Sequence, residues 1–421
     1  MMDFKYTLNQ RPPFRHLLLY GLQWLVVSIP NVLTVAVLGK LQFADNVALQ
    51  TLYLQKVYVV MGITMLAQAF FGHRLPIVVG PAAVLIVGIL SAASEGFDAV
   101  YTALATGGAV LFLLSVSGFL DKVVRIFTPR VIITILGLIA MTLAPVIINL
   151  VFSDGNPVFN FVFFIVAIVA VFLIDRMLSG VGKTMTVVVL TVGATVAYFL
   201  FNPLPASPST AGAALHGRLF VHFDFNPAVV VAFLICFFAL LINELGSIES
   251  VRSMTGAADT AKRTKRGCAV VGLGNVFSGL LGVIGPVDFS ISPGIISSTR
   301  CASRYTIIPC GIGLLLCACF PAAVEWLTLM PNLVIGILLT YIIVLQLASA
   351  FNMIVETHSV TTFEHALTIA LPLCAALIVA FMPVSVSDSL PAMLRPILTN
   401  GFVVSVLLVV FVEHFVFLKR N

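Results

Sequence analysis

Apolar stretches of about 20 residues follow one another along nearly the whole chain, from residue 16 to residue 418. A helix of that length crosses about 30 Å of hydrocarbon. Hydrophobic residues make up 60% of the 421 residues and charged residues only 9%, whereas an ordinary soluble domain has about 25% charged residues. The sequence therefore predicts an all-α polytopic membrane protein with almost no chain left for a soluble domain.

Polar breaks divide these stretches into fourteen predicted transmembrane segments, near residues 16–39, 50–71, 75–92, 97–118, 129–152, 159–177, 184–202, 228–251, 267–285, 287–299, 305–323, 331–352, 363–382 and 398–418. With a cytoplasmic N-terminus, all of the 22 Lys and Arg residues except Lys40, Lys56, Arg218 and Arg395 fall on the cytoplasmic side. Membrane proteins gather Lys and Arg on that side, so we expect an even number of crossings and two cytoplasmic termini. The polar first fifteen residues precede no small-residue cleavage site, which predicts an uncleaved start.

Residue patterns that would support catalysis or a metal site are missing from the sequence. The seven cysteines are scattered, with no CxxC pair and no histidine cluster nearby, and no nucleophile stands in a motif with its base. We therefore expect no enzymatic activity, metal or cofactor. The basic run KRTKR at 262–266 lies in a short loop between membrane helices, where such charge serves topology, so we expect lipid around the protein but no nucleic-acid partner.

The two halves of the chain resemble each other at three separated places. TPRVIITILGL from Thr128 matches MPNLVIGILLT from Met330 at an offset of 202, Asn31 matches Asn243 at 212, and Gly80 matches Gly294 at 214. Offsets near half the length indicate an internal repeat. Seven segments per repeat is an odd number, so the second repeat must be inverted in the membrane, as in many secondary transporters.

Two segments in corresponding positions of the repeats are interrupted by proline and glycine. LPIVVGPAAVLIVG at 75–88 and GPVDFSISPGIISSTR at 285–300 each predict a short extended strand, a break and a short helix. Backbone polar groups at membrane depth cannot face lipid, so we expect the strands to pair or to line a polar cavity. The helix starts would offer backbone N–H groups to a substrate oxygen. The candidate donors are Ala82, Ala83, Ser290, Ser292 and Gly294.

Glu244 in the eighth segment and Asp288 in the tenth lie deepest in the apolar sequence. A carboxylate at the centre of a membrane helix costs at least about 2.5 kcal/mol, so each needs a partner or a function. As substrate ligands they would accept hydrogen bonds from ring N–H groups, and burial would allow protonation linked to transport. As structural acids, Glu244 would pair with a backbone amide or Asn31, and Asp288 would cap the local backbone. Phe289 could stack on a ring or simply pack.

The stretch SPGIISSTRCASR at 292–304 resembles the signature of the nucleobase-ascorbate transporter family, the xanthine/uracil permeases. LPIVVGP, NVFSGLLG and MPNLVIG in the third, ninth and twelfth segments agree with it, so the resemblance covers nearly the whole chain. It implies two inverted repeats of seven segments, with short β-strands in segments 3 and 10. It also implies a core domain of residues 16–118 and 228–323, a gate domain of residues 119–202 and 324–418, a homodimer, and a bacterial inner membrane.

The chain departs from the family pattern in the third segment, where Ala82 and Ala83 replace the Ser or aromatic residue of many relatives, and in the eighth and tenth segments. The family usually carries an acid on the eighth segment three residues before a glycine, where this chain has Asn243 before Gly246. Glu244 follows one residue later, a step of about 100° around the helix. Members also commonly carry Glu or Gln at the position of Ile291, three residues after Asp288. Asn243, Glu244 and Asp288 are therefore all candidate substrate contacts.

Together these patterns predict a secondary active transporter that brings a small planar solute such as uracil or xanthine into the cytoplasm with a proton or a sodium ion. Glu244 and Asp288 are the predicted coupling residues. An anion transporter of the sulfate or bicarbonate type, with the same inverted-repeat architecture, is an alternative that the missing acid at Ile291 favours and the two carboxylates disfavour. A channel is a further alternative.

Overall fold

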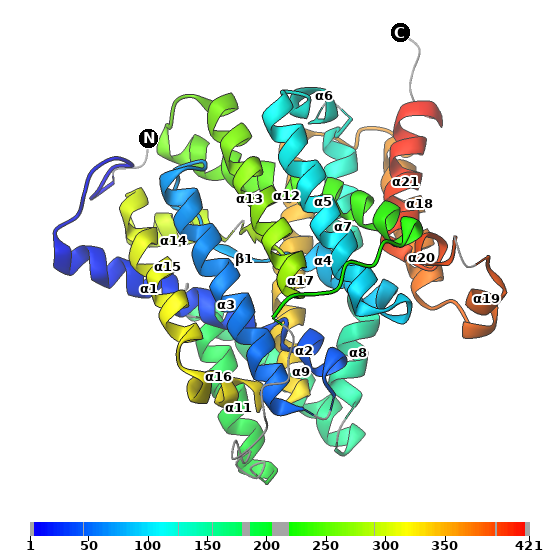
Figure 1. Ribbon diagram of the computed structural model, residues 1–421, viewed down its shortest axis with the longest axis horizontal. Helices are drawn as coiled ribbons and strands as arrows, with labels where there is room; N and C mark the ends of the chain where they lie inside the picture. Colours follow the sequence, from blue (N-terminus) through cyan, green and yellow to red (C-terminus); the bar gives the residue numbers. More distant parts are fainter. Residues whose placement is uncertain are drawn as a thin grey trace.

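Helices make up nearly all of the protein in a computed structural model that describes residues 4–44, 46–124, 126–153, 155–178, 186–203, 219–289, 291–391 and 394–416. They pack side by side into one bundle (Figure 1). In the first half they are α1 (Phe14–Leu33), α2 (Ala36–Gln42), α3 (Val47–Phe70), α4 (Ala83–Ala92), α5 (Phe97–Ser117), α6 (Leu120–Val124), α7 (Pro129–Thr142), α8 (Ala144–Phe152), α9 (Pro157–Met177) and α11 (Thr186–Phe201). In the second half they are α12 (Pro227–Thr255), α13 (Thr260–Leu281), α14 (Ser292–Thr299), α15 (Ile307–Ala318), α16 (Pro321–Thr328), α17 (Asn332–Thr357), α18 (Phe363–Ala380), α19 (Val384–Ser389), α20 (Arg395–Leu398) and α21 (Gly401–Phe411).

Each of the fourteen predicted segments contains at least part of a helix. Within the described residues, seven helical stretches are long and apolar enough to cross a membrane: α1 with α2, α5, α7 with α8, α9, α12, α17 and α18. Four further helices, α4, α11, α15 and α21, are also apolar but shorter. The all-helical membrane architecture is therefore confirmed by helices that are apolar over a full membrane thickness.

Proline preceded by a capping side chain starts α7, α9 and α12. Thr128, Asn156 and Asn226 each accept a hydrogen bond from a backbone N–H of the first turn. The proline that follows lacks an N–H that would have no partner at that position anyway. These starts fix where the chain turns back into the bundle.

Helix contacts repeat in a pattern that exchanges the two halves of the chain. α5 packs against α13 as α3 packs against α15, and α12 packs against α5 as α1 packs against α15. We exchange α1, α3, α4 and α5 with α12, α13, α14 and α15, in that order. The contact of α5 with α13 then becomes that of α15 with α3, and the contact of α12 with α5 becomes that of α1 with α15. Two structurally repeated halves produce this pattern.

The two interrupted segments pair as short strands in the middle of the bundle (Figure 1). β1 (Val79–Pro81) runs antiparallel to β2 (Pro286–Asp288), with Val79 opposite Asp288 and Pro81 opposite Pro286. All six strand residues are buried. The predicted strands in segments 3 and 10, and their pairing, are confirmed.

Glycines bring α5 and α13 together backbone against backbone. A Cβ built on Gly272 would lie 2.7 Å from the backbone nitrogen of Phe112, and one on Gly279 would lie 2.6 Å from that of Ala105. Small residues permit such close approach between membrane helices, where packing supplies most of the attraction.

Replacing Gly272 with alanine is expected to destabilise the protein, because the added Cβ meets backbone atoms of α5 that cannot rotate away. Overpacking of this kind costs about 1–3 kcal/mol. The measurement is the midpoint of thermal unfolding of detergent-purified protein, which should fall. Gly193→Ala in α11 is the matched control, because a Cβ there meets nothing within 4 Å. An unchanged midpoint for Gly272→Ala would contradict the packing.

Candidate functional site

The backbone at the two breaks is bonded within the protein. The N–H of Ala82 donates to the carbonyl of Gly285 at 3.0 Å, and the N–H of Phe289 donates to the carbonyl of Val78 at 2.8 Å. These bonds extend the pairing of β1 and β2 to the starts of α4 and α14. Polar backbone at membrane depth needs such partners, since an unbonded group there costs several kcal/mol.

The first turn of α4 presents two backbone donors that no described residue accepts. Ala82 caps the helix in an extended conformation, with φ −74° and ψ 112°. It is buried, whereas Ala83 is partly exposed. Among the residues that the structure describes, none accepts a hydrogen bond from the N–H of Ala83 or Val84. N–H groups at a helix start carry partial positive charge, so this end of α4 can hold a substrate oxygen.

The first turn of α14 is largely committed to internal bonds. The buried hydroxyl of Ser292 donates to the carbonyl of Phe289 at 2.7 Å and accepts the N–H of Val78 at 3.1 Å. The N–H groups of Ser292 and Gly294 donate to the carbonyls of Phe289 and Ile291 at 3.3 and 3.0 Å. Ser292 therefore joins β1 to α14, and the predicted donors at Ser292 and Gly294 are both engaged within the turn.

Phe289 packs its ring on the backbone of β1. A Cβ on Gly80 would fall 2.5 Å from Cζ of Phe289, so only glycine permits this contact. The side chain of Phe289 nevertheless stays partly exposed. Part of the ring is thus left for a planar group to stack on.

Glu244 is fully buried in α12, which packs against β2. Its Oε2 accepts the backbone N–H of Asp288 at 3.0 Å, and its Oε1 accepts the side-chain amide of Gln68 at 3.4 Å. The carboxylate therefore holds β2 through a backbone amide, one of the two roles that the sequence left open. Asn31 is engaged elsewhere, because its amide donates to the carbonyl of Val27 at 2.9 Å.

Asp288 is also fully buried, and it faces a histidine. Nε2 of His73 lies 2.9 Å from Oδ2 of Asp288, while Nδ1 of His73 accepts the N–H of Leu75 at 2.9 Å. Because Nδ1 accepts the N–H of Leu75, a neutral His73 carries its proton on Nε2, the nitrogen that lies near Asp288. Gln68, His73, Glu244 and Asp288 together form the buried polar cluster. Within the described chain, no group of three His, Cys, Asp or Glu side chains is arranged to hold a metal ion.

Sequence reasoning missed two members of this cluster, Gln68 and His73. They belong to QAFFGHRLP, which ends α3 and leads directly into the first broken segment. A glutamine and a histidine beside a polar break in an apolar chain are a usable signal, because buried polar side chains need partners.

Open space borders α12 and α14 at two glycines. Gly246 and Gly294 are both exposed, and a Cβ on either would meet no heavy atom within 4 Å. Asn243 is partly exposed on the same helix as Gly246, whereas Glu244 and Asp288 are fully buried. Asn243 is therefore more accessible than either acid. Ser290, also predicted as a donor, lies outside the described residues.

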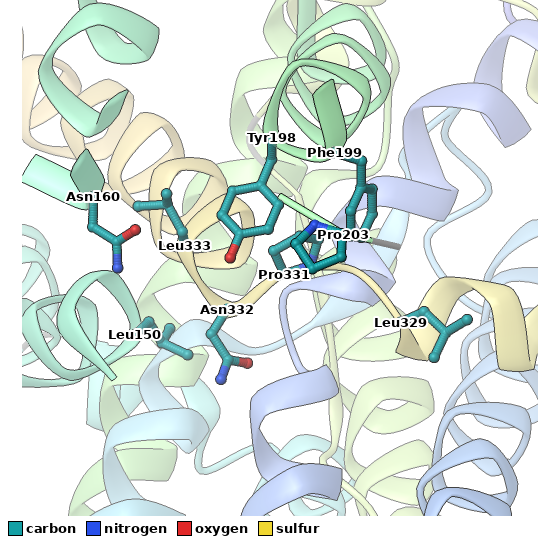
Figure 2. Close-up of a pocket in the computed structure, with 9 residues that line it drawn as sticks. All are labelled: Leu150, Asn160, Tyr198, Phe199, Pro203, Leu329, Pro331, Asn332 and Leu333. Carbon is teal, nitrogen blue, oxygen red and sulfur yellow. The ribbon is translucent and has the colours of Figure 1, made fainter. Parts of the chain in front are cut away.

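A separate pocket of about 210 Å³ lies among the ends of α8, α9, α11 and α17 (Figure 2). Asn160 and Asn332 supply polar groups to it, but both are engaged: Asn160 donates to the carbonyl of Val151 at 2.9 Å, and Asn332 accepts from Nζ of Lys40 at 2.8 Å. None of the lining residues belongs to β1, β2 or the starts of α4 and α14. This pocket is not part of the candidate site.

Comparison with known proteins matches a family model described as a permease family, Xan_ur_permease, over residues 15–385. The xanthine permease of Bacillus subtilis (strain 168) is 24% identical over 368 residues, which cover 84% of this chain and 83% of that protein. The nucleobase transporter PlUacP of Paenibacillus larvae subsp. larvae is 23% identical over 344 residues, covering 79% and 78%. CPE0397 of Clostridium perfringens is 28% identical over 299 residues, which span 69% of this chain and 65% of that protein's own length.

Solved structures of membrane transporters share the fold. The transmembrane domain of a cyanobacterium bicarbonate transporter, BicA, superposes with a TM-score of 0.65 at 15% identity and covers 88% of this chain and 97% of that chain. The murine Solute Carrier 26 family member A9 anion transporter, in an inward-facing state, gives a TM-score of 0.63 at 13% identity, covering 96% and 69%. At sequence identities this low, the comparison shows a shared fold but does not identify the solute.

Replacing Ser292 with alanine is expected to loosen the candidate site, because the buried N–H of Val78 loses its acceptor. An unsatisfied buried donor costs about 1–3 kcal/mol. Thermal unfolding of the purified protein should therefore have a lower midpoint. Ser297→Ala is the control on the same helix, since the Ser297 hydroxyl bonds only within α14 and is partly exposed. Equal midpoints for the two variants would show that Ser292 does not hold β1 to α14.

Proposed function

The chain belongs to the permease family of the xanthine/uracil permeases, and from that membership we propose that it is a secondary active transporter that carries a nucleobase of the xanthine or uracil type into the cytoplasm with a proton. Membership makes it a membrane transporter rather than an enzyme. The observation that carries the proposal is the pairing of β1 with β2, which sets two helix starts beside open space at Gly246 and Gly294. Transporters of this architecture bind their solutes where such half-helices meet.

In the proposed binding mode, a carbonyl oxygen of the base accepts from the N–H groups of Ala83 and Val84, which have no other acceptor among the described residues. The planar ring stacks on the exposed part of Phe289. Asn243 faces the edge of the ring, because an amide side chain both donates and accepts and so complements alternating C=O and N–H groups. Gly246 and Gly294 leave the room that the ring needs.

The buried polar cluster supplies the proposed coupling. An ionised Glu244 accepts two N–H groups, one of them the backbone amide of Asp288. A protonated carboxyl loses part of that acceptor capacity, so its hold on β2 weakens. Phe289, the proposed stacking residue, follows Asp288 directly in the chain. A proton on the cluster therefore alters the position of the Phe289 ring on which the base stacks. His73 faces Asp288 and can exchange that proton. Sodium in place of a proton would appear as sodium-dependent uptake.

The proposed movement is a rocking of two domains around this site. We assign residues 16–118 and 228–323 to a core and residues 119–202 and 324–418 to a gate, with fourteen crossings in two inverted repeats. The exchange of helix contacts between the halves supports this division. Cytoplasmic termini, a homodimer and a bacterial inner membrane belong to the same proposal, in keeping with the bacterial relatives.

An anion of the sulfate or bicarbonate type is the second candidate solute. Both acids of the site are fully buried, while α4 presents two N–H groups that have no acceptor among the described residues. A helix start without a facing carboxylate suits a negative charge. Competition between unlabelled anions and labelled nucleobases distinguishes the two solutes.

Uptake of radiolabelled xanthine and uracil in cells that lack their own permeases tests the proposal. The parent protein should accumulate at least one of these bases, and a protonophore should abolish the accumulation. Glu244→Gln should retain about one tenth of the parent's uptake or less, because a hydrogen bond to a charged group contributes about 1.5–3 kcal/mol and 1.4 kcal/mol corresponds to a factor of ten.

Glu249→Gln is the matched control for this experiment. Glu249 lies on the same helix but is exposed, and it pairs with Arg252 at 2.7 Å. It should transport like the parent at equal membrane abundance. Full uptake by Glu244→Gln would remove the buried cluster from the mechanism, and uptake of sulfate or bicarbonate without either base would replace the proposed solute.

A further inference from the structure

A second pocket, of about 260 Å³, lies between the end of α3 and the start of α15. Its lining residues are Ala69, Phe70, Arg74, Arg304, Tyr305 and Ile308. Arg74 belongs to the link from α3 to β1, and Arg304 begins the short 3-10 turn that follows α14. The pocket therefore sits where the chain enters one broken segment and leaves the other. It is separate from the candidate transport site, because it shares no residue with that site.

The charge of this pocket is not neutralised within the described part of the protein. Among the described residues, neither Arg74 nor Arg304 forms an ion pair with Asp or Glu. Nε of Arg304 is buried and has no hydrogen-bond partner among the described residues. A buried donor without a partner is available to an acceptor on a ligand.

Further cations surround the same place. The guanidinium groups of Arg304 and Arg11 lie 4.9 and 5.1 Å from the ring centre of Tyr305. Arg263 donates to the carbonyls of His73 at 2.7 Å and Arg74 at 3.3 Å. Asp259 interacts electrostatically with Arg263. Four arginines with one peripheral acid favour an anionic ligand.

Apolar surface continues from the mouth of the pocket along both helices. Phe70 of α3 is 47% exposed, and the neighbouring Phe71 is 72% exposed. On α15, Ile312 and Leu316 are 47% and 55% exposed. α3 and α15 pack side by side (Figure 1), so a ligand with a charged head in the pocket could lay hydrocarbon chains over these faces. A free anion would make no use of them.

We propose that this pocket binds the phosphate of an anionic phospholipid, with its acyl chains on the exposed faces of α3 and α15. Guanidinium groups match phosphate oxygens with several donors in one plane. The volume equals several water molecules at about 30 Å³ each and so accommodates a phosphate group. Basic pockets between membrane helices bind anionic headgroups in this way. The bound phosphate would tie Arg74, before β1, to Arg304, after α14.

The test is thermal unfolding of full-length protein in detergent, titrated with phosphatidylglycerol, phosphatidylcholine or inorganic phosphate. Phosphatidylglycerol should raise the unfolding midpoint, and the other two should not at equal concentration. Arg304→Gln should weaken phosphatidylglycerol binding about tenfold, as expected for loss of a charge-assisted contact. Arg15→Gln is the control, because it removes an exposed charge outside the pocket.

Three results would overturn the proposal. An equal midpoint shift with phosphatidylcholine would show that headgroup charge is irrelevant, and an equal shift with inorganic phosphate would identify a free anion as the ligand. An equal response of Arg304→Gln and Arg15→Gln would place the lipid elsewhere. If Arg304→Gln does not fold, Arg74→Gln takes its place, and native mass spectrometry of the parent must show phosphatidylglycerol retained in preference to phosphatidylcholine.

Discussion

The structure depends on one constraint: two segments leave the helical conformation inside an apolar bundle, and their backbone groups must still be bonded. The antiparallel pairing of β1 with β2 meets this need for both segments at once, through bonds such as Ala82 N–H to Gly285 and Phe289 N–H to Val78. Neither segment could satisfy its own backbone, since lipid offers no partners. The pairing therefore joins the two halves of the chain and sets the starts of α4 and α14 in the middle of the protein.

The same need for partners inside the bundle explains the surroundings of the two buried acids, Glu244 and Asp288. Glu244 bonds the backbone of β2, and Asp288 turns its carboxylate to His73. The carboxylate of Glu244, which accepts two N–H groups, is stabilised as part of the strand pair. In our proposal the cluster senses the proton, and the strand it holds carries Phe289 to the solute. Coupling would then pass through the position of a backbone strand, without direct contact between acid and base.

Much of this arrangement was predictable from the sequence. Proline and glycine at matching places in two repeats predicted the broken segments and their pairing, because the rule on backbone bonding in lipid leaves few alternatives. Which way Glu244 and Asn243 point could not be predicted, since one residue on a helix rotates the side chain by about 100° and only packing fixes the phase. Likewise, the backbone N–H of Ser292 was expected to face a substrate, but it donates to the carbonyl of Phe289, and the Ser292 hydroxyl accepts the N–H of Val78, a contact across 214 residues. His73 and Gln68 were missed because their partners lie on α12, α13 and β2.

The central claim, that the paired broken segments form the nucleobase site, is tested most directly by hydrogen exchange with and without xanthine, read by mass spectrometry of the purified protein. We expect xanthine to slow amide exchange in residues 82–86 and in residues 287–296, in proportion to its occupancy of the site. Slower exchange confined to the pocket among α8, α9, α11 and α17, with no change at the strands, would contradict it.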